Sequence, residues 1–191
     1  MLFFTADTHF GHANILKLCD RPFDTIEEMN EALIRRWNRK VSGGDTVYIL
    51  GDMFFRCSDP VPILERLRGR KVLIVGNHDS SWMDKVDLDK YFLEVADFKV
   101  ITNGQYAITL CHYPLLTWKH QRKSYMIHGH IHADTTDDFF PLISQRERVL
   151  NAGMDINGFE PVTFEELVEN NARFKDAYRQ DAAGEGDAEM C

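Results

Sequence analysis

The chain has 191 residues, 44% of them apolar, and a formal net charge of −8. This length suffices for one well-buried core or two small ones, and we expect a single domain over residues 1–180. An acidic chain lacks the broad basic face that binds nucleic acid, so extended nucleic-acid binding is not expected, although a short cationic phosphate site stays open.

Neither the apolar segments nor the cysteines of the sequence indicate export or a membrane span. The segment before Asp7 has no basic leader and too few apolar residues for a secretory signal or a membrane span, and no other stretch approaches spanning length. The four cysteines form no CxxC pair and suit a reduced environment. We predict a cytoplasmic protein with no membrane partner, and the sequence does not indicate its oligomeric state.

Seven short runs rich in Val, Ile, Phe and Tyr predict strands. They cover residues 2–6, 46–50, 71–75, 98–102, 106–111, 125–128 and 148–151. Between the first two, a helix is predicted with Asp24 as its N-cap and Glu27 at the reciprocal position, followed by apolar residues at helical spacing as far as Trp37. The early alternation of helices and strands, with strands crowded later, favours a layered α/β fold over an all-parallel sheet.

Two further helices are predicted from capping signals. Residues 60–69 begin with prolines that suit a first turn and end at Gly69. Another helix begins after Thr163, where Glu166 completes a capping box. Beyond it, residues 181–191 are rich in Ala, Gly and acids, which predicts a flexible tail.

Potential metal ligands follow the first two predicted strands. Asp7 and His9 lie two residues apart, so they share one face if the strand continues in extended form, and together they form a claw for one cation. The alternative is that Asp7 caps a turn and His9 lies on the surface. Asp52 follows Gly51 just past the second strand, where its carboxylate can reach two cations or simply serve a turn.

Three later strands end in the same kind of residue. Gly76-Asn77-His78-Asp79 offers an amide oxygen that suits a hard cation, and it leaves His78 pointing elsewhere and free for proton transfer. His112 follows residues 107–111, and His130 and His132 follow residues 125–128. Crowded histidines repel one another when protonated and lose solvation when buried, so metal coordination is the simplest explanation. The whole oxygen and nitrogen set suits two cations with added solvent.

Five motifs occur in this order: Asp-Xxx-His, Gly-Asp, Gly-Asn-His-Asp, a single His and Gly-His-Xxx-His. In this order of motifs the chain resembles the calcineurin-like metallophosphoesterases over about residues 1–158. The resemblance implies an α/β, four-layer fold: a two-sheet β-sandwich of mixed strands flanked by helices, with a dinuclear metal centre at the strand ends. It implies that one metal is held by Asp7, His9 and His132, and the other by Asn77, His112 and His130. Asp52 would bridge them. Mn is the first expectation, and Fe, Zn and Ni also accept this ligand set.

The resemblance also implies an activity: hydrolysis of a phosphomonoester or phosphodiester by attack of a metal-bridging hydroxide. His78 would hydrogen-bond the phosphate or protonate the leaving alkoxide. The chain departs from the protein phosphatase branch, whose Gly-Asp-Xxx-Xxx-Asp-Arg-Gly motif supplies an aspartate that orients the catalytic histidine. Here the segment reads Gly51-Asp52-Met53-Phe54-Phe55-Arg56-Cys57, so no acidic partner for His78 can be placed.

Two alternatives stay open beside a phosphoesterase that acts on a small phosphorylated substrate or phosphodiester. One is a nuclease or a cyclic-nucleotide phosphodiesterase. The other is a catalytically silent metal-binding scaffold, since a fold alone does not define an activity.

Two segments between the motifs are candidates for substrate contacts. His12 and Asn14 would line the pocket, with Arg21 as an anion contact; alternatively the first two cap a helix and Arg21 pairs at the surface. Residues 118–123 form a basic and aromatic loop, which is either solvated or a phosphate or base-stacking contact.

Overall fold

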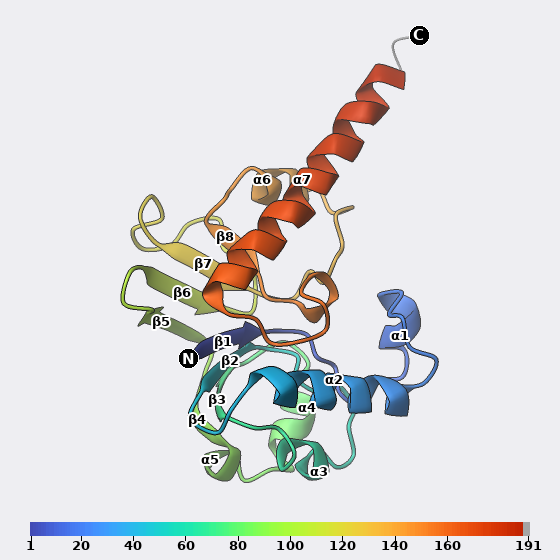
Figure 1. Ribbon diagram of the computed structural model, residues 1–191, viewed down its shortest axis with the longest axis vertical. Helices are drawn as coiled ribbons and strands as arrows, with labels where there is room; N and C mark the ends of the chain where they lie inside the picture. Colours follow the sequence, from blue (N-terminus) through green and yellow to red (C-terminus); the bar gives the residue numbers. More distant parts are fainter. Residues whose placement is uncertain (189–191) are drawn as a thin grey trace.

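The computed structural model describes the backbone of residues 1–188 and the side chains of residues 1–182 (Figure 1). Its centre is a pair of four-stranded sheets. The first sheet is parallel throughout, in the order β1 (Leu2–Thr5), β2 (Thr46–Leu50), β3 (Arg70–Ile74) and β4 (Phe92–Ala96). The second has the order β5 (Phe98–Thr102), β6 (Ala107–Cys111), β7 (Tyr125–His128) and β8 (Val149–Asn151). Within it only β5 and β6 pair antiparallel, so the predicted α/β sandwich of mixed strands is confirmed.

The strands separate two apolar layers, because successive side chains of a strand point to opposite faces. In β1, Phe3 belongs to the cluster under the helices and Phe4 to the cluster between the sheets. The inter-sheet cluster also holds Leu50 of β2 and Ile127 of β7. Strands buried on both faces explain why the sequence shows continuous apolar runs here.

Helices cover the outer faces of both sheets. Figure 1 shows α2 (Ile26–Lys40) across the first sheet and α7 (Phe164–Ala188) across the second. Met29, Leu33 and Trp37 recur on one side of α2 and are fully buried. The result is the predicted order of four layers.

The N-cap of α2 differs by one residue from the prediction. Thr25, not Asp24, is the cap, and its hydroxyl accepts from the Glu28 backbone N–H at 3.1 Å. The Glu28 carboxylate accepts from the Asp24 N–H at 2.9 Å. Thr25 and Glu28 thus replace the predicted pair Asp24 and Glu27, and the glutamate bonds the residue before the cap instead of the cap itself.

The predicted helix over residues 60–69 is a single turn, α3 (Val61–Leu64). Beyond it, the Arg66 carbonyl accepts from the Asn38 side chain at 2.8 Å and the Arg68 carbonyl accepts from the Trp37 indole at 2.9 Å. These bonds to α2 replace the helical ones. The other short elements are α1 (Ile15–Leu18), α4 (Ser80–Met83), α5 (Leu88–Tyr91), α6 (Phe140–Ser144) and the 3₁₀ helix η1 (Met154–Ile156).

The predicted start of the last helix is confirmed. The Glu166 carboxylate accepts from the Thr163 N–H at 2.8 Å, and the Thr163 hydroxyl accepts from the Glu166 N–H at 3.3 Å. Helix α7 continues across residue 180, so residues 181–188 of the predicted tail have helical backbone, while residues 189–191 lie outside the described residues. The domain boundary at 180 stays a prediction. Over residues 1–188, no helix is long and apolar enough to cross a membrane.

Candidate metal centre

The predicted ligands meet at one edge of the sandwich because they follow the carboxyl ends of parallel strands. Asp7, Asp52 and Asn77 come after β1, β2 and β3 of the first sheet. The three later histidines come after β6 and β7 of the second sheet, which are also parallel. Backbone bonds join the loops: the Asp7 N–H donates to the Gly51 carbonyl at 3.0 Å and the His9 N–H donates to the Asp52 carbonyl at 3.0 Å.

The atoms of the candidate ligands form two adjacent groups. Those of Asp7, His9 and His132 lie within 4.8 Å of one another, and so do those of Asp52, His112 and His130. Asn77 joins the second group, with its Oδ1 2.9 Å from His112 Nε2. Asp52 lies between the groups, since its Oδ2 is 3.8 Å from His9 Nε2 and 3.6 Å from His112 Nε2. All seven predicted ligands are brought together.

The backbone at these ligands is not extended, which corrects the geometry expected for the Asp7–His9 claw and for the His130–His132 pair. Strands β1 and β7 end at Thr5 and His128, and the ligands that follow have left-handed backbone. L-residues adopt this region at a cost, and such strain concentrates at functional sites. The φ values are Asp7 55°, His9 49°, Asp52 53°, His130 72° and His132 50°.

Two glycines let the strand ends approach each other closely. Gly51 has φ +84°, and a Cβ there would lie 2.3 Å from His112 Nδ1. A Cβ on Gly129 would lie 2.7 Å from Asp7 Oδ2. No other residue fits without moving a ligand.

Hydrogen bonds fix the orientation of two of the histidine rings. His112 Nδ1 donates to the Leu50 carbonyl at 2.7 Å, which leaves its Nε2 toward Asn77 and Asp52. His132 Nδ1 lies 2.9 Å from Asp155 Oδ2. A partner behind the metal-binding nitrogen is the usual device for orienting a histidine ligand.

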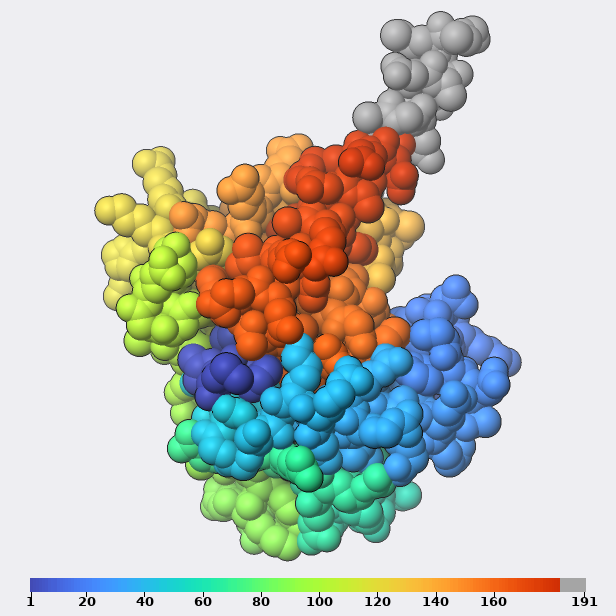
Figure 2. All heavy atoms as spheres, viewed as in Figure 1, coloured from blue at the N-terminus to red at the C-terminus, as the bar shows by residue number. Residues whose placement is uncertain are grey.

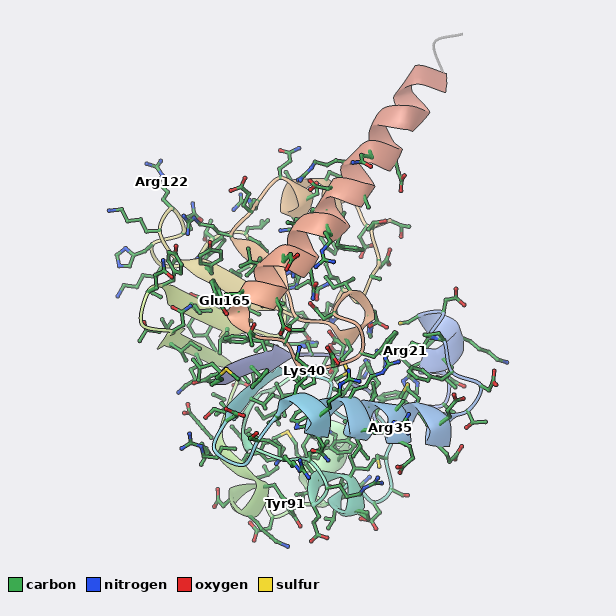
Figure 3. All side chains as sticks on the ribbon, viewed as in Figure 1. Arg21, Arg35, Lys40, Tyr91, Arg122 and Glu165 are labelled. Carbon is green, nitrogen blue, oxygen red and sulfur yellow. The ribbon has the colours of Figure 1, made fainter. Side chains whose placement is uncertain are left out.

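Arg21 completes this network from the far side and does not take the role expected of it. Its guanidinium donates to Asp155 from Nε at 2.8 Å and from Nη2 at 3.1 Å, and to the backbone carbonyls of Asp7 at 2.7 Å and Thr8 at 3.0 Å. Arg21 is only 4% exposed, and Figure 3 shows it beside α1. An anion could reach this guanidinium only by breaking those bonds, and Arg21 is not a surface pair either.

The other two residues of the predicted substrate segment differ in position. The His12 ring lies 5.4 Å from the His9 ring and 4.4 Å from the Phe55 ring, so it adjoins the first ligand group. Asn14 is exposed at the start of α1 and makes no capping hydrogen bond with its side chain. His12 therefore adjoins the first group of candidate ligands, and the substrate contacts expected of His12 and Asn14 stay predictions.

Asp79 has a role that its place in the Gly-Asn-His-Asp motif did not reveal. Its fully buried carboxylate accepts from the backbone N–H groups of Asp52 at 2.9 Å, Met53 at 2.9 Å and Gly76 at 2.8 Å, and from the Trp82 indole at 2.8 Å. These bonds tie the loop after β2 to the loop after β3. They position Asp52 against Asn77.

His78 is held by its backbone and by packing. Its N–H donates to Asp52 Oδ1 at 2.9 Å, and its ring lies edge-on to Phe55 with the centroids 4.3 Å apart. Within the described part of the chain, no side chain hydrogen-bonds the imidazole. Phe55 therefore contacts this histidine from the sequence position at which the protein phosphatase branch carries aspartate.

Burial dominates the electrostatics of the first ligand group. It raises the pKa of Asp7 to about 6, although His132 and His112 oppose the shift. Burial, His132 and Arg21 hold the pKa of His9 far below its usual range, so its ring is neutral. Burial also disfavours the charged form of His132, but the hydrogen bond to Asp155, a contact with Cys19 and the nearby charge of Asp7 together outweigh burial and raise the pKa of His132 to about 10.

The residues present fit a bound cation. Among the described residues, neither ring nitrogen of the buried His9 has a hydrogen-bond partner, and such an atom costs about 1–3 kcal/mol. A cation held by His9, Asp7 and His132 would satisfy one of those nitrogens and compete with the proton on His132.

Comparison with known proteins agrees with this geometry. The family described as "Calcineurin-like phosphoesterase" matches residues 2–181. The chain belongs to this family. This calcineurin-like phosphoesterase is 35% identical over 170 residues to an uncharacterised protein of Methanocaldococcus jannaschii, which covers 87% of this chain and 89% of the relative. A solved structure of a protein of unknown function from Aquifex aeolicus matches it with a TM-score of 0.70 and 28% identity, over 88% of this chain and 98% of that one.

Proposed function

We propose that this calcineurin-like phosphoesterase hydrolyses a phosphomonoester or phosphodiester in a metal-dependent reaction. The proposal rests on the two groups of candidate ligands that meet at Asp52. The first group includes the buried His9, whose ring nitrogens have no hydrogen-bond partner among the described residues. Two adjacent groups of mixed oxygen and nitrogen donors suit two cations better than one.

The ligands divide between two cations. Asp7, His9 and His132 would hold one of them, and Asn77, His112 and His130 the other, with Asp52 shared. When bound, such cations lower the pKa of coordinated water and offset charge on phosphoryl oxygens. Mn is our first choice, and Fe, Zn and Ni fit the same donors.

His78 is the residue that we assign to proton transfer. Its side chain is 37% exposed, whereas those of His9 and His112 are 3% and 1% exposed. It is therefore an imidazole beside Asp52 that a substrate can reach, with Nε2 3.9 Å from Asp52 Oδ2. From that position it would hydrogen-bond the phosphate or protonate the leaving alkoxide.

The test starts from purified protein that is stripped of metal, titrated with Mn and assayed with 4-nitrophenyl phosphate and bis(4-nitrophenyl) phosphate. With phenyl phosphate as a further substrate, whose leaving group needs a proton, His78→Ala should lower kcat by about 10²- to 10⁴-fold with metal binding retained. Asp52→Asn should lose Mn binding as well as activity, whereas Asp89→Asn, an exposed aspartate on α5, should match the parent protein.

Each outcome separates the alternatives. Activity that is the same without metal and in both the His78→Ala and Asp52→Asn variants would refute the enzyme proposal. Tight Mn binding without hydrolysis of any ester would favour the metal-binding scaffold. Cyclic nucleotides and oligonucleotides in the same assay distinguish a cyclic-nucleotide phosphodiesterase and a nuclease from a general phosphoesterase.

A further inference from the structure

A group of cations lies at the end of the second sheet opposite to the metal centre. We call it the basic patch, and it consists of Lys119, Arg122, Lys123, Arg146 and Arg148. The first three precede β7 and the last two precede β8. Because β7 and β8 are parallel, both segments lie at their amino ends, whereas the ligands His130 and His132 follow the carboxyl end of β7. Figure 3 shows Arg122 on the loop before β7, pointing away from the body of the molecule.

The charge of the patch opposes that of the chain as a whole. The chain carries −8, yet the patch brings five cations together, and Lys119, Arg122 and Lys123 are exposed. Within the described residues none of the five forms an ion pair. Two hollows lie at the patch, and Glu147 is the one acidic residue that lines them. Clustered cations that repel one another create a field that attracts an anion.

The two hollows have volumes in the range of small-molecule binding sites. One, of about 450 Å³, is lined by Trp118 and Arg122 together with Arg146 and Arg148. The other, of about 480 Å³, lies against the same Trp118 and Arg122 with Lys123. Binding sites for small molecules span about 300–1,000 Å³. Figure 2 shows this loop, coloured yellow, as a protruding lobe at the edge of the molecule.

Contacts hold Trp118 and two of the guanidinium groups of the patch in place. The half-buried Trp118 donates from Nε1 to the Ser124 hydroxyl at 3.0 Å, which fixes the indole between the two hollows. Arg146 donates to the Leu116 carbonyl at 2.7 Å, and the Arg148 guanidinium lies 4.8 Å from the centre of the Tyr125 ring. The patch therefore combines a held indole and two held guanidinium groups with the exposed side chains of Lys119, Arg122 and Lys123.

We propose that the basic patch binds a short single-stranded nucleic acid, with phosphates on the Arg and Lys side chains and a base on Trp118. Cations that follow a backbone together with an aromatic ring on which a base stacks are the elements of single-strand recognition. Binding of an isolated phosphate would not need an aromatic ring. In a duplex the faces of the bases are stacked on one another, so they cannot stack on Trp118. The patch is confined to one loop and one turn, so it suits a few nucleotides and not an extended duplex.

The test measures binding of fluorescein-labelled dT12 by anisotropy at several salt concentrations, beside a duplex of the same length. The double change Arg122→Glu and Lys123→Glu should weaken dT12 binding at least tenfold. It should also reduce the slope of log K against log salt by about 1.4, at about 0.7 per lost phosphate contact on a single strand. The matched control reverses two exposed cations elsewhere, Arg35→Glu and Lys90→Glu, and should bind as the parent does.

Tryptophan fluorescence gives an independent readout, since Trp37 and Trp82 are both 0% exposed. Quenching by dT12 therefore reports on Trp118. Thermal unfolding of each variant checks that the fold is intact. Absence of dT12 binding, equal binding of the duplex, equal binding by the patch variant, or absence of quenching would each overturn the proposal.

The same variants separate this proposal from the phosphoesterase reaction. Charge reversal at the patch should leave hydrolysis of bis(4-nitrophenyl) phosphate unchanged. Failure of that hydrolysis with intact dT12 binding would count against the proposed function alone.

Discussion

Replacing Phe55 tests whether packing orients His78. The Phe55 ring lies 4.3 Å from the His78 ring, and an aromatic pair of this kind contributes about 0.5–1.5 kcal/mol. If that contact holds the imidazole toward the substrate, Phe55→Leu should lower kcat by about 2- to 13-fold for an ester whose leaving group needs a proton. Phe55→Tyr keeps the ring and should restore most of the rate.

The assay compares two esters that differ in their need for an acid. Phenyl phosphate requires protonation of its leaving group more than 4-nitrophenyl phosphate does, so Phe55→Leu should slow the first and spare the second. Phe139→Leu, a half-buried phenylalanine next to α6, is the matched control.

A double-mutant cycle gives the decisive result. Phe55 also touches His12 at 4.4 Å, so its effect must be measured again with His78→Ala present. If Phe55 acts through His78, the second change adds nothing. Equal slowing of both esters, or additive losses, would refute the reasoning.

Two further predictions concern the supports of the site, and a third concerns a buried lysine of α7. Asp155→Asn should lower the affinity for Mn about 10- to 100-fold, because it weakens the hydrogen bond to His132 and leaves the buried Arg21 without its carboxylate partner. Titration calorimetry measures this affinity, and an unchanged value would show that the network is dispensable. Gly51→Ala should destabilise far more than Gly104→Ala in chemical denaturation: both have positive φ, but a Cβ at Gly104 meets nothing within 4 Å. Lys175 is 4% exposed, and burial lowers its pKa to about 8, so the unfolded chain keeps this proton to higher pH than the folded one. The difference in free energy of unfolding between the parent and Lys175→Met should therefore increase by about 3 kcal/mol, in favour of the parent, between pH 8 and 10.5. A difference that does not change with pH would contradict this prediction.

The strands that carry ligands were predictable because each combines a buried apolar run with a polar residue at its end. Strand β4 (Phe92–Ala96) was missed, since only its first residue is fully buried and the apolar pattern is correspondingly weak. The N-cap of α2 was misplaced by one residue because Asp24 and Thr25 are both good caps, and only the fold shows which side chain meets the N–H of Glu28.

The grouping of the candidate ligands was predictable from the sequence, and the residues that support them were not. His, Asp and Asn side chains at strand ends indicate a metal site, because these side chains are common metal ligands. Asp155 and Arg21 are 134 residues apart, and nothing local in either segment indicates that they meet. The extended geometry expected for Asp7 and His9 was wrong, because bonds to the loop after β2 bend the chain there.

The left-handed conformation of five ligands constrains when the site can form during synthesis. Asp7 and His9 are held by carbonyls of residues 51 and 52, so the first claw has no defined shape until β2 is in place. His132, the third member of that group, emerges from the ribosome more than a hundred residues after Asp7. A cation that binds this group would therefore meet a nearly complete chain, and it would stabilise the folded protein instead of guiding the early steps of folding.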